Sequence, residues 1–243
     1  MSDRPIQLSI VVPVKDEAEN VAPLAREIAA AIGNEAQREI IFVDDGSADT
    51  TAQELLKLKR EMPALRVISH ARNAGQSRAI RTGVRGARGP IVVTLDGDGQ
   101  NDPADIPKLL AALRAGPPKL ALVSGVRVNR KDTFAKRFTS RIANGFRGWV
   151  LGDHAKDVGC SLKAFRRDAF LALPYFDNIH RFIIPLMLRE GYEVRFVDVN
   201  HRQRTRGASK YNMRNRLFVG LTDIAGVLWL KRRYRGPVES KEL

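Results

Sequence analysis

Short apolar runs alternate with amphipathic segments along the first half of the chain. The runs at 8–14, 39–44, 65–70, 90–95 and 119–125 are rich in Val, Ile and Leu and have the length of buried strands. Segment 19–32 has apolar residues at helical spacing, and further helices are expected at about 50–62, 75–86 and 103–114. This β-α alternation predicts an α/β fold, with a mostly parallel sheet flanked by helices and joined by right-handed crossovers.

The chain is long enough for one full-sized domain. Its 243 residues are 44% hydrophobic, which suits one α/β domain with a substantial core and a C-terminal extension. We place the domain at residues 1–210 and the extension, a basic amphipathic helical tail, at 211–243. The single cysteine, Cys160, excludes an internal disulfide framework and a cysteine-based zinc site.

Positive charge is concentrated in the second half of the chain. Residues 127–235 carry 24 Lys and Arg against 9 Asp and Glu, while the remaining residues hold 17 against 18, for a net charge of +14. Such a surplus implies a nucleic acid, a phosphorylated substrate or an anionic membrane surface as partner. Aromatic residues are few and no nucleic-acid-binding motif is present, so nucleic acid is the most distant of these alternatives.

The apolar stretch 217–230 stands out near the C-terminus. It has 14 residues and is interrupted by Asp223, so it is shorter than the roughly 18 to 20 residues needed to span a bilayer. Basic residues flank it on both sides, and Trp229 lies beside the basic end. We therefore expect an interfacial helix on an anionic leaflet, with a helix packed on the domain or on a dimer partner as the alternative.

Acidic residues follow three of the predicted strands. They are Glu17 after the first strand, Asp44 and Asp45 at the end of the second, and Asp96 and Asp98 after the fourth. The carboxyl ends of parallel strands meet at one edge of an open sheet, where such folds bind ligands. The sequence therefore predicts one acidic crevice that binds a cation or several hydrogen-bond donors.

The stretch "TLDGDGQNDP" has the spacing of a divalent metal site. Mg²⁺ and Mn²⁺ prefer oxygen ligands and usually take one or two carboxylates from the protein, with phosphate and water completing the shell. Gly97 lets the backbone approach the ligand, and we expect Asp98 to be the direct ligand and Asp45 to contact a ribose or base. Taken alone, the Asp-Gly-Asp-Gly run would also fit a turn and helix cap.

Several ordered segments resemble one family. "SIVVPVKDEAENV", "IFVDDGSADTT", "RNAGQSRAIRTGV" and "VVTLDGDGQNDPADIPKLL" resemble the nucleotide-sugar-binding segments of family 2 inverting glycosyltransferases with the GT-A fold. "DVGCSLKAFRRDAF" and "RQRTRGASKY" are similar to later motifs of its dolichyl-phosphate mannose synthase and polyprenyl-phosphate glycosyltransferase branch. The resemblance covers residues 6–212 and implies a Rossmann-like sheet.

The resemblance also implies a role for each matching residue. The nucleotide-sugar site would contain Pro13, Lys15, Glu17, Asp44, Asp45, Asp96, Gly97, Gln100 and Arg206. The acceptor phosphate would be bound by Lys136, Arg137, Ser140, Arg141 and Ser209, and the metal ion by Asp96, Asp98 and Gln100. Catalysis would depend on Asp98, Arg127, Asp157, Arg202 and Lys210, with Arg204 in the same basic loop.

The implied reaction is inverting sugar transfer. A nucleophile attacks the anomeric carbon opposite the departing nucleoside diphosphate. A polyprenyl phosphate is already anionic at neutral pH and needs cations to hold it, whereas a saccharide or other alcohol acceptor would need a general base. Asp157 is then either an organiser of the acceptor loop or such a base.

We therefore expect a cytoplasmic enzyme attached peripherally to the inner face of the cell membrane. Its expected partners are a UDP- or GDP-type sugar, a polyprenyl phosphate, Mg²⁺ or Mn²⁺ and an anionic membrane surface, with a homodimer as an option. An alcohol acceptor within the same family is the nearest alternative. A nucleotidyltransferase is less consistent, because that class usually begins with a glycine-rich basic phosphate loop that "VVPVKDEAEN" lacks.

Overall fold

The computed structural model describes residues 5–33, 35, 37–128, 145, 147–153, 155, 157–203, 214–236 and 241, and only the backbone of residues 214–219. Strands and helices alternate through the first half of the chain, as the sequence predicts. The elements are, in chain order, β1 (Leu8–Val14), α1 (Ala18–Ala31), β2 (Arg38–Asp44), α2 (Thr51–Glu61), β3 (Leu65–Ser69), α3 (Gln76–Gly86), β4 (Ile91–Thr94), η1 (Pro103–Asp105), α4 (Ile106–Arg114), β5 (Leu120–Arg127), β6 (Lys163–Arg166), α6 (Arg167–Ala172), η2 (Ile179–Arg181), α7 (Ile183–Arg189), β7 (Glu193–Val199) and α8 (Arg214–Arg233).

In the described residues, seven strands form one sheet in the order β3-β2-β1-β4-β6-β5-β7. Strands β3, β2, β1 and β4 are parallel to one another, and β5 is parallel to β7. The short strand β6 runs antiparallel to both of its neighbours, β4 and β5. The predicted mostly parallel sheet is confirmed, and the antiparallel insertion of β6 is a feature that the hydrophobic pattern did not indicate.

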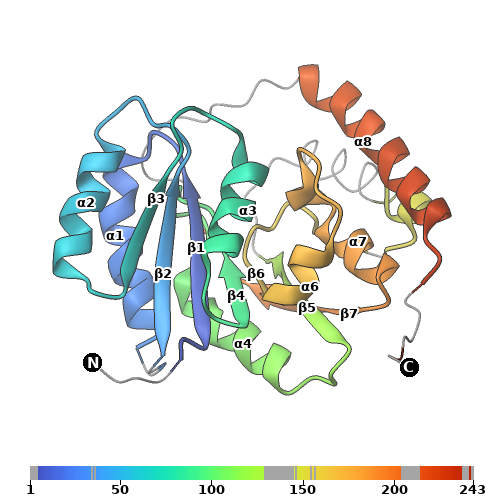
Figure 1. Ribbon diagram of the computed structural model, residues 1–243, viewed down its shortest axis with the longest axis horizontal. Coiled ribbons are helices and arrows are strands. Elements are labelled where there is room, and N and C mark those ends of the chain that lie inside the picture. The colour runs from blue at the N-terminus through green and yellow to red at the C-terminus, as the bar shows by residue number, and fades with distance from the viewer. Residues whose placement is uncertain are drawn as a thin grey trace.

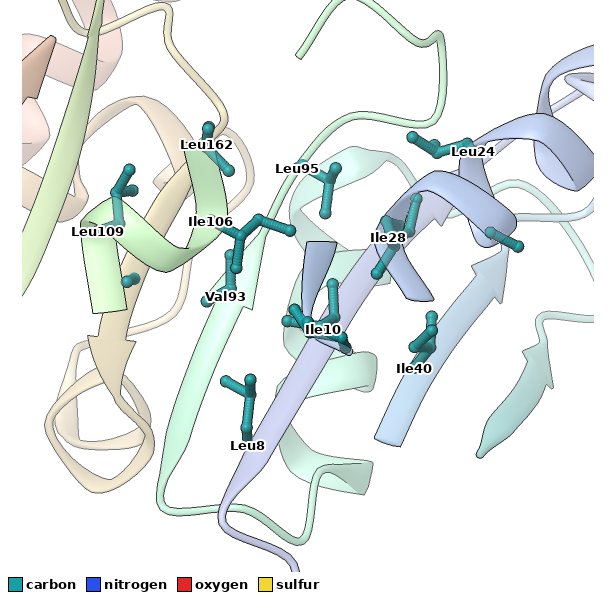
Figure 2. Packing of buried hydrophobic residues seen from close by; sticks show 14 of the residues in the cluster. Leu8, Ile10, Leu24, Ile28, Ile40, Val93, Leu95, Ile106, Leu109 and Leu162 are labelled. Atoms are coloured by element: carbon teal, nitrogen blue, oxygen red, sulfur yellow. The ribbon is translucent and has the colours of Figure 1, made fainter. Parts of the chain in front are cut away.

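Helices cover both faces of the sheet (Figure 1). Helices α1, α2 and α4 contribute apolar side chains to one buried cluster, and α3, α6 and α7 contribute to the cluster on the other side. Successive strand residues serve both clusters, since Ile10 belongs to the first and Val11 to the second. Figure 2 shows Ile10 and Val93 of the strands packed near Ile28 of α1 and Ile106 of α4. Burial on both faces explains why these strands are continuously apolar.

The C-terminal helix α8 packs against α7 and the second apolar cluster. Val227 is fully buried, and Ile224 and Leu228 are partly buried against that cluster. Leu221 and Trp229 instead remain 49% and 59% exposed. The predicted helical extension is confirmed, but Ile224 and Leu228 face the protein rather than a lipid surface. No helix in the described part of the chain is both long and apolar enough to cross a bilayer.

Candidate functional site

The carboxyl ends of β1, β2 and β4 meet at one edge of the sheet. The register pairs Val14 with Asp44 and Val11 with Thr94. A pocket of about 510 Å³ opens at this edge. Its lining contains predicted residues from all three strand ends: Pro13, Lys15, Glu17, Asp45, Asp96, Gly97 and Asp98. The structure therefore gathers the predicted acids, except Asp44, around one crevice.

Asp96 and Asp98 face this pocket from the loop that follows β4. Burial, followed by the charge of Asp98, raises the pKa of Asp96 to about 6. The Ser161 hydroxyl and the charges of Lys163 and Arg127 act in the opposite direction and offset part of this rise. The raised pKa identifies a place where two carboxylates repel one another, and where a bound cation would relieve the repulsion.

The donor atoms at this place fit a divalent metal bound together with a phosphate. Gln76 of α3 donates to Asp96 at 2.7 Å, and Asp98 accepts from the Gln100 amide at 3.1 Å. Within the described residues, no three His, Cys, Asp or Glu side chains cluster as metal ligands. A pair of carboxylates is nevertheless what Mg²⁺ commonly takes from a protein when phosphate oxygens and water supply the other ligands. The Gln100 side chain, predicted as a third ligand, is not part of the pocket lining.

Position 97, between the two carboxylates, has no room for a side chain and so requires glycine. A Cβ at this position would lie 2.4 Å from Cγ1 of Val14 and 3.0 Å from the carbonyl oxygen of Pro13. The loop therefore presses directly against the end of β1, and this contact places Asp96 and Asp98 beside the residues that follow β1.

Lys15 and Glu17 reach the pocket from the turn after β1. Lys15 donates to the Gly46 carbonyl at 3.0 Å, and the Glu17 carboxylate accepts from Asn20 at 2.6 Å. Asp16, between them, has a φ of 47°, in the left-handed region. This turn allows both of its neighbours to line the same pocket.

Asp45 organises the chain segment that leads into α3. Its carboxylate accepts from Nδ1 of His70 at 2.7 Å and from the amides of Ala74 and Gly75, each at 2.9 Å. Gly75 has a φ of 88°, which favours glycine. The sequence predicted a ribose or base contact for Asp45. The structure shows a residue that lines the pocket and already compensates its charge with three donors.

Asp44, which the resemblance implied to contact the nucleotide, lies outside the pocket lining. It is 2% exposed, and one oxygen accepts from the Ser47 amide at 3.1 Å and from the Ser47 hydroxyl at 2.5 Å. The other oxygen accepts from the Ser69 hydroxyl at 3.3 Å. Asp44 therefore closes the turn at Gly46, where an added Cβ would lie 2.6 Å from the backbone of Arg72.

Arg127 and Asp157, both predicted as catalytic, are paired with each other. Nε and Nη2 of Arg127 donate to the two oxygens of Asp157 at 2.7 and 2.8 Å, and the backbone amide of Arg127 donates at 3.2 Å. Neither residue belongs to the pocket lining. This geometry makes Asp157 the partner of a largely buried guanidinium, and the charge of Arg127 also acts on Asp96.

Lys163 is a buried cation that the sequence analysis did not single out. It is 3% exposed at the start of β6, and its ammonium donates to the Cys160 carbonyl. Burial lowers the pKa of Lys163, while the negative charges of nearby groups, Asp96 among them, raise it. The β6 insertion between β4 and β5 brings this charge close to Asp96, so only the strand order could have revealed it.

Arg202, which the resemblance implied to be a catalytic residue of the basic loop, is not part of the pocket lining. Its guanidinium donates to Glu27 at 2.5 Å and to Asp102 at 2.7 Å, and its side chain is 41% exposed. Its amide donates to the Gln100 carbonyl at 2.9 Å, and the neighbouring residue His201 forms a β-bridge with Asn101. These contacts attach the beginning of the basic loop to α1 and to the loop that follows β4.

The remaining predicted site residues lie outside the described part of the chain. They are Lys136, Arg137, Ser140 and Arg141 of the first basic segment, and Arg204, Arg206, Ser209 and Lys210 of the second. Their roles stay predictions.

A further wall of the pocket comes from the chain between α6 and α7. Asp177, Asn178, His180 and Arg181 line the pocket together with Asn73 and Gln76. The sequence analysis missed this wall, because the segment "PYFDNIHRF" has no periodic pattern and follows the unpredicted strand β6. The pocket therefore has one side at the strand ends, where Lys15 accompanies the acids, and a separate side that carries Asp177, His180 and Arg181.

Comparison with known proteins agrees with this architecture. The glycosyl transferase family 2 model matches residues 9–173. A dodecaprenyl-phosphate galacturonate synthase from Rhizobium johnstonii is 37% identical over 96% of this chain and 69% of its own length. An undecaprenyl-phosphate 4-deoxy-4-formamido-L-arabinose transferase from Edwardsiella ictaluri is 36% identical over 85% of this chain and 63% of its own length. The chain thus spans about two thirds of these relatives.

Solved structures share the fold at low sequence identity. Glucosyl-3-phosphoglycerate synthase from Mycobacterium tuberculosis, in complex with Mn²⁺, UDP and phosphoglyceric acid, superposes with a TM-score of 0.68 at 18% identity, over 96% of this chain and 80% of its own. A mannosyltransferase from Pyrobaculum calidifontis with GDP-Man and Mn²⁺ gives 0.67 at 19% identity, over 98% of this chain and 67% of its own. The chain is a glycosyltransferase with a GT-A-like fold, and it belongs to glycosyltransferase family 2, in the branch of the polyprenyl-phosphate enzymes.

Proposed function

We propose that this enzyme transfers a sugar, with inversion, from a nucleoside diphosphate sugar to a polyprenyl phosphate. The observation that carries the proposal is the Asp96–Asp98 pair, which faces a pocket of about 510 Å³ at the carboxyl ends of three strands. Burial, followed by the charge of Asp98, raises the pKa of Asp96 to about 6, and a perturbed pKa in a cleft is typical of a functional site. The diphosphate of the donor is the ligand that such a cation would hold.

Mg²⁺ or Mn²⁺ fits this pair of carboxylates, and when bound it would supply positive charge to the departing nucleoside diphosphate. The chain's own residues do the positioning. Gln76 holds the Asp96 carboxylate, Gly97 lets the loop lie against β1, and Lys15 and Glu17 line the part of the pocket that would receive the nucleoside. Groups that are already in position when negative charge develops on the departing diphosphate stabilise that charge. They lower the reaction barrier because they do not have to move during the reaction.

A phosphate acceptor agrees with the environment of Asp157. Its carboxylate accepts from Arg127 and from the amide of Gly159, so its hydrogen-bonding capacity serves the protein rather than an acceptor hydroxyl. A phosphate oxygen is already anionic and can attack the anomeric carbon without a base. The basic surplus of residues 127–235 and the acceptors named for the relatives support the same choice.

Peripheral attachment to the cytoplasmic face of an anionic membrane completes the proposal. Trp149 is 82% exposed, and the helical residues 147–151 adjoin α8, because Lys231 donates to the Leu151 carbonyl. Trp229 and Leu221 of α8 are also exposed, and Arg232, Arg233 and Arg235 follow at its end. Exposed tryptophan beside clustered arginine is the composition of an interfacial anchor.

The acceptor is tested with a matched pair of lipids. Purified enzyme with Mn²⁺ and a labelled donor is offered a polyprenyl phosphate or the polyprenol of the same length. We expect a labelled product with the phosphate and none with the alcohol, with the opposite anomeric configuration to the donor and no product with Asp98→Asn. Transfer to the polyprenol, or only to a saccharide, would favour the alternative acceptor class.

Membrane attachment is tested separately by vesicle sedimentation. Vesicles with anionic lipid should sediment the wild type at low salt, and the double variant W149A/W229A should bind at least tenfold more weakly. Leu56→Ala is the matched control, because Leu56 is 53% exposed on α2 and lies in the other half of the fold. Protein that stays in the supernatant with anionic vesicles would contradict the attachment.

A further inference from the structure

His180 and Arg181, on the wall between α6 and α7, add an imidazole and a guanidinium to a pocket that already contains Lys15 and several carboxylates. Both residues line the pocket and are half-buried. The nucleoside and diphosphate are assigned above to the strand ends, so this wall is left for the sugar or for the acceptor. Its chemistry bears on which sugar the enzyme accepts.

The wall is held in a fixed position against α3. Nδ1 of His180 lies 2.7 Å from the hydroxyl of Ser77, which is 1% exposed, and the His180 amide donates to the same hydroxyl at 3.4 Å. Asn178 has a φ of 64°, and the Arg181 amide donates to its carbonyl at 3.0 Å. A side chain on such a turn is presented to the pocket with little freedom to reorganise.

The same stretch of α3 connects this wall to the diphosphate site. Gln76 bonds to Asp96, and the next residue, Ser77, bonds to His180. A sugar linked to a diphosphate at Asp96 and Asp98 would therefore extend along the start of α3 toward His180 and Arg181.

Two protein carboxylates, Asp177 and Asp223, interact with each other beside this wall. Asp177 also lines the pocket, and Asp223 of α8 lies near enough for the Arg181 charge to act on it. Burial raises the pKa of Asp223, while Arg181 and a hydrogen bond from Asn178 lower it. The hydrogen bond between Asp223 and Asn178 therefore connects α8 to the turn that carries Arg181.

An arginine on the sugar side of the pocket selects for a particular kind of sugar. A neutral hexose presents hydroxyl groups, which amide and hydroxyl side chains satisfy. A guanidinium matches a carboxylate with two parallel hydrogen bonds, and charge-assisted bonds of this kind are roughly twice as strong as neutral ones. We propose that the donor sugar carries a carboxylate, as in a nucleoside diphosphate hexuronate, and that Arg181, with His180 beside it, binds that carboxylate.

This inference rests on the proposed function, and the experiment separates the two. Calorimetry in the presence of Mn²⁺ compares UDP-galacturonate with UDP-galactose and GDP-mannuronate with GDP-mannose, with UDP and GDP alone as references. For the nucleotide that binds, the uronate should bind roughly tenfold or more tightly than the neutral hexose. Arg181→Gln should remove this preference and change the affinity for the free nucleotide less than twofold. Arg181→Lys should keep part of the preference.

Arg78→Gln is the matched control, because Arg78 also lies on this side of the fold but stacks on Tyr175 at 4.1 Å outside the pocket lining. It should leave the preference intact. Equal affinity for uronate and neutral hexose would overturn the inference and leave the proposed function standing. A preference that survives Arg181→Gln, with a raised KM for polyprenyl phosphate, would assign Arg181 to the acceptor and also overturn it. Absence of all nucleotide binding would overturn both.

Discussion

Arg127 and Asp157 form a bidentate ion pair, with N–O distances of 2.7 and 2.8 Å. Their side chains are only 16% and 7% exposed. The pair joins the end of β5 to the segment that leads into β6. The positive charge of Arg127 also acts on Asp96. One buried pair therefore ties the architecture of the sheet to the electrostatics of the candidate metal site.

Asp157→Asn should lower the free energy of unfolding as well as the activity. The substitution leaves the buried Arg127 without its counter-charge, and breaking a buried pair in this way costs about 3–5 kcal/mol. Urea unfolding measures the change. The double variant R127L/D157L should recover most of the loss, because it removes both charges. If Asp157 acted as a catalytic base without this structural part, Asp157→Asn would unfold at the wild-type urea concentration.

Metal binding should weaken as the pH falls through about 6, the pKa to which burial and Asp98 raise Asp96. Below that pH the metal ion must displace a proton, so its apparent affinity falls by up to about tenfold per pH unit. Because the folded pKa is raised, the metal-free protein should also lose stability as the pH rises from the unfolded value through about 6. Calorimetric Mn²⁺ titrations and thermal unfolding across this range check both trends. A flat affinity profile between pH of roughly 5 and 7 would contradict the assignment.

Gly97→Ala should impair nucleotide and metal binding through a steric effect. The new methyl group would lie 2.4 Å from Cγ1 of Val14, and overpacking of this kind costs about 1–3 kcal/mol. Val14→Ala in the same chain removes that contact and should restore part of the binding. Gly226→Ala on α8 is the control, because a Cβ there meets nothing within 4 Å and its backbone is not in the left-handed region. Binding by Gly97→Ala at the wild-type level would show that the loop need not press on β1.

Asp45→Ala should loosen the start of α3. The substitution removes the acceptor for the amides of Ala74 and Gly75 and for His70, and unsatisfied buried donors cost about 1–3 kcal/mol each. Hydrogen exchange at Ala74 and Gly75 should speed up at least tenfold in the absence of nucleotide. A nucleotide-binding role alone would leave this exchange unchanged and reduce only the affinity.

The hydrophobic pattern predicted the first five strands and four helices because each is long, apolar and bounded by turns. The acids at the strand ends could be grouped because a parallel sheet places the carboxyl ends of its strands together. Asp44 shows the limit of that argument. It is adjacent to Asp45 in sequence, but successive residues at a strand end point in different directions, and only Asp45 reaches the pocket.

The second half of the site depended on pairings that no local pattern encodes. β6 is four residues long and begins with the buried Lys163, so it lacks the signature of a strand. Its insertion between β4 and β5 determines where Lys163 and Asp157 lie. The His180–Ser77 contact joins residues 103 positions apart, and the pairing of Arg202 with Glu27 spans 175. The motifs singled out Asp157 and Arg202 but not Lys163 or His180, and the fold determines the partners of all four.

The central claim is that Asp96 and Asp98 hold a divalent ion against the diphosphate of a sugar nucleotide. Calorimetric titration of UDP, GDP, dTDP and CDP, with and without Mn²⁺, tests it directly. We expect one nucleotide to bind in a metal-dependent manner, and Asp98→Asn to lose that binding while unfolding at the wild-type temperature. Nucleotide binding of equal strength without metal, or unchanged binding by Asp98→Asn, would contradict the account.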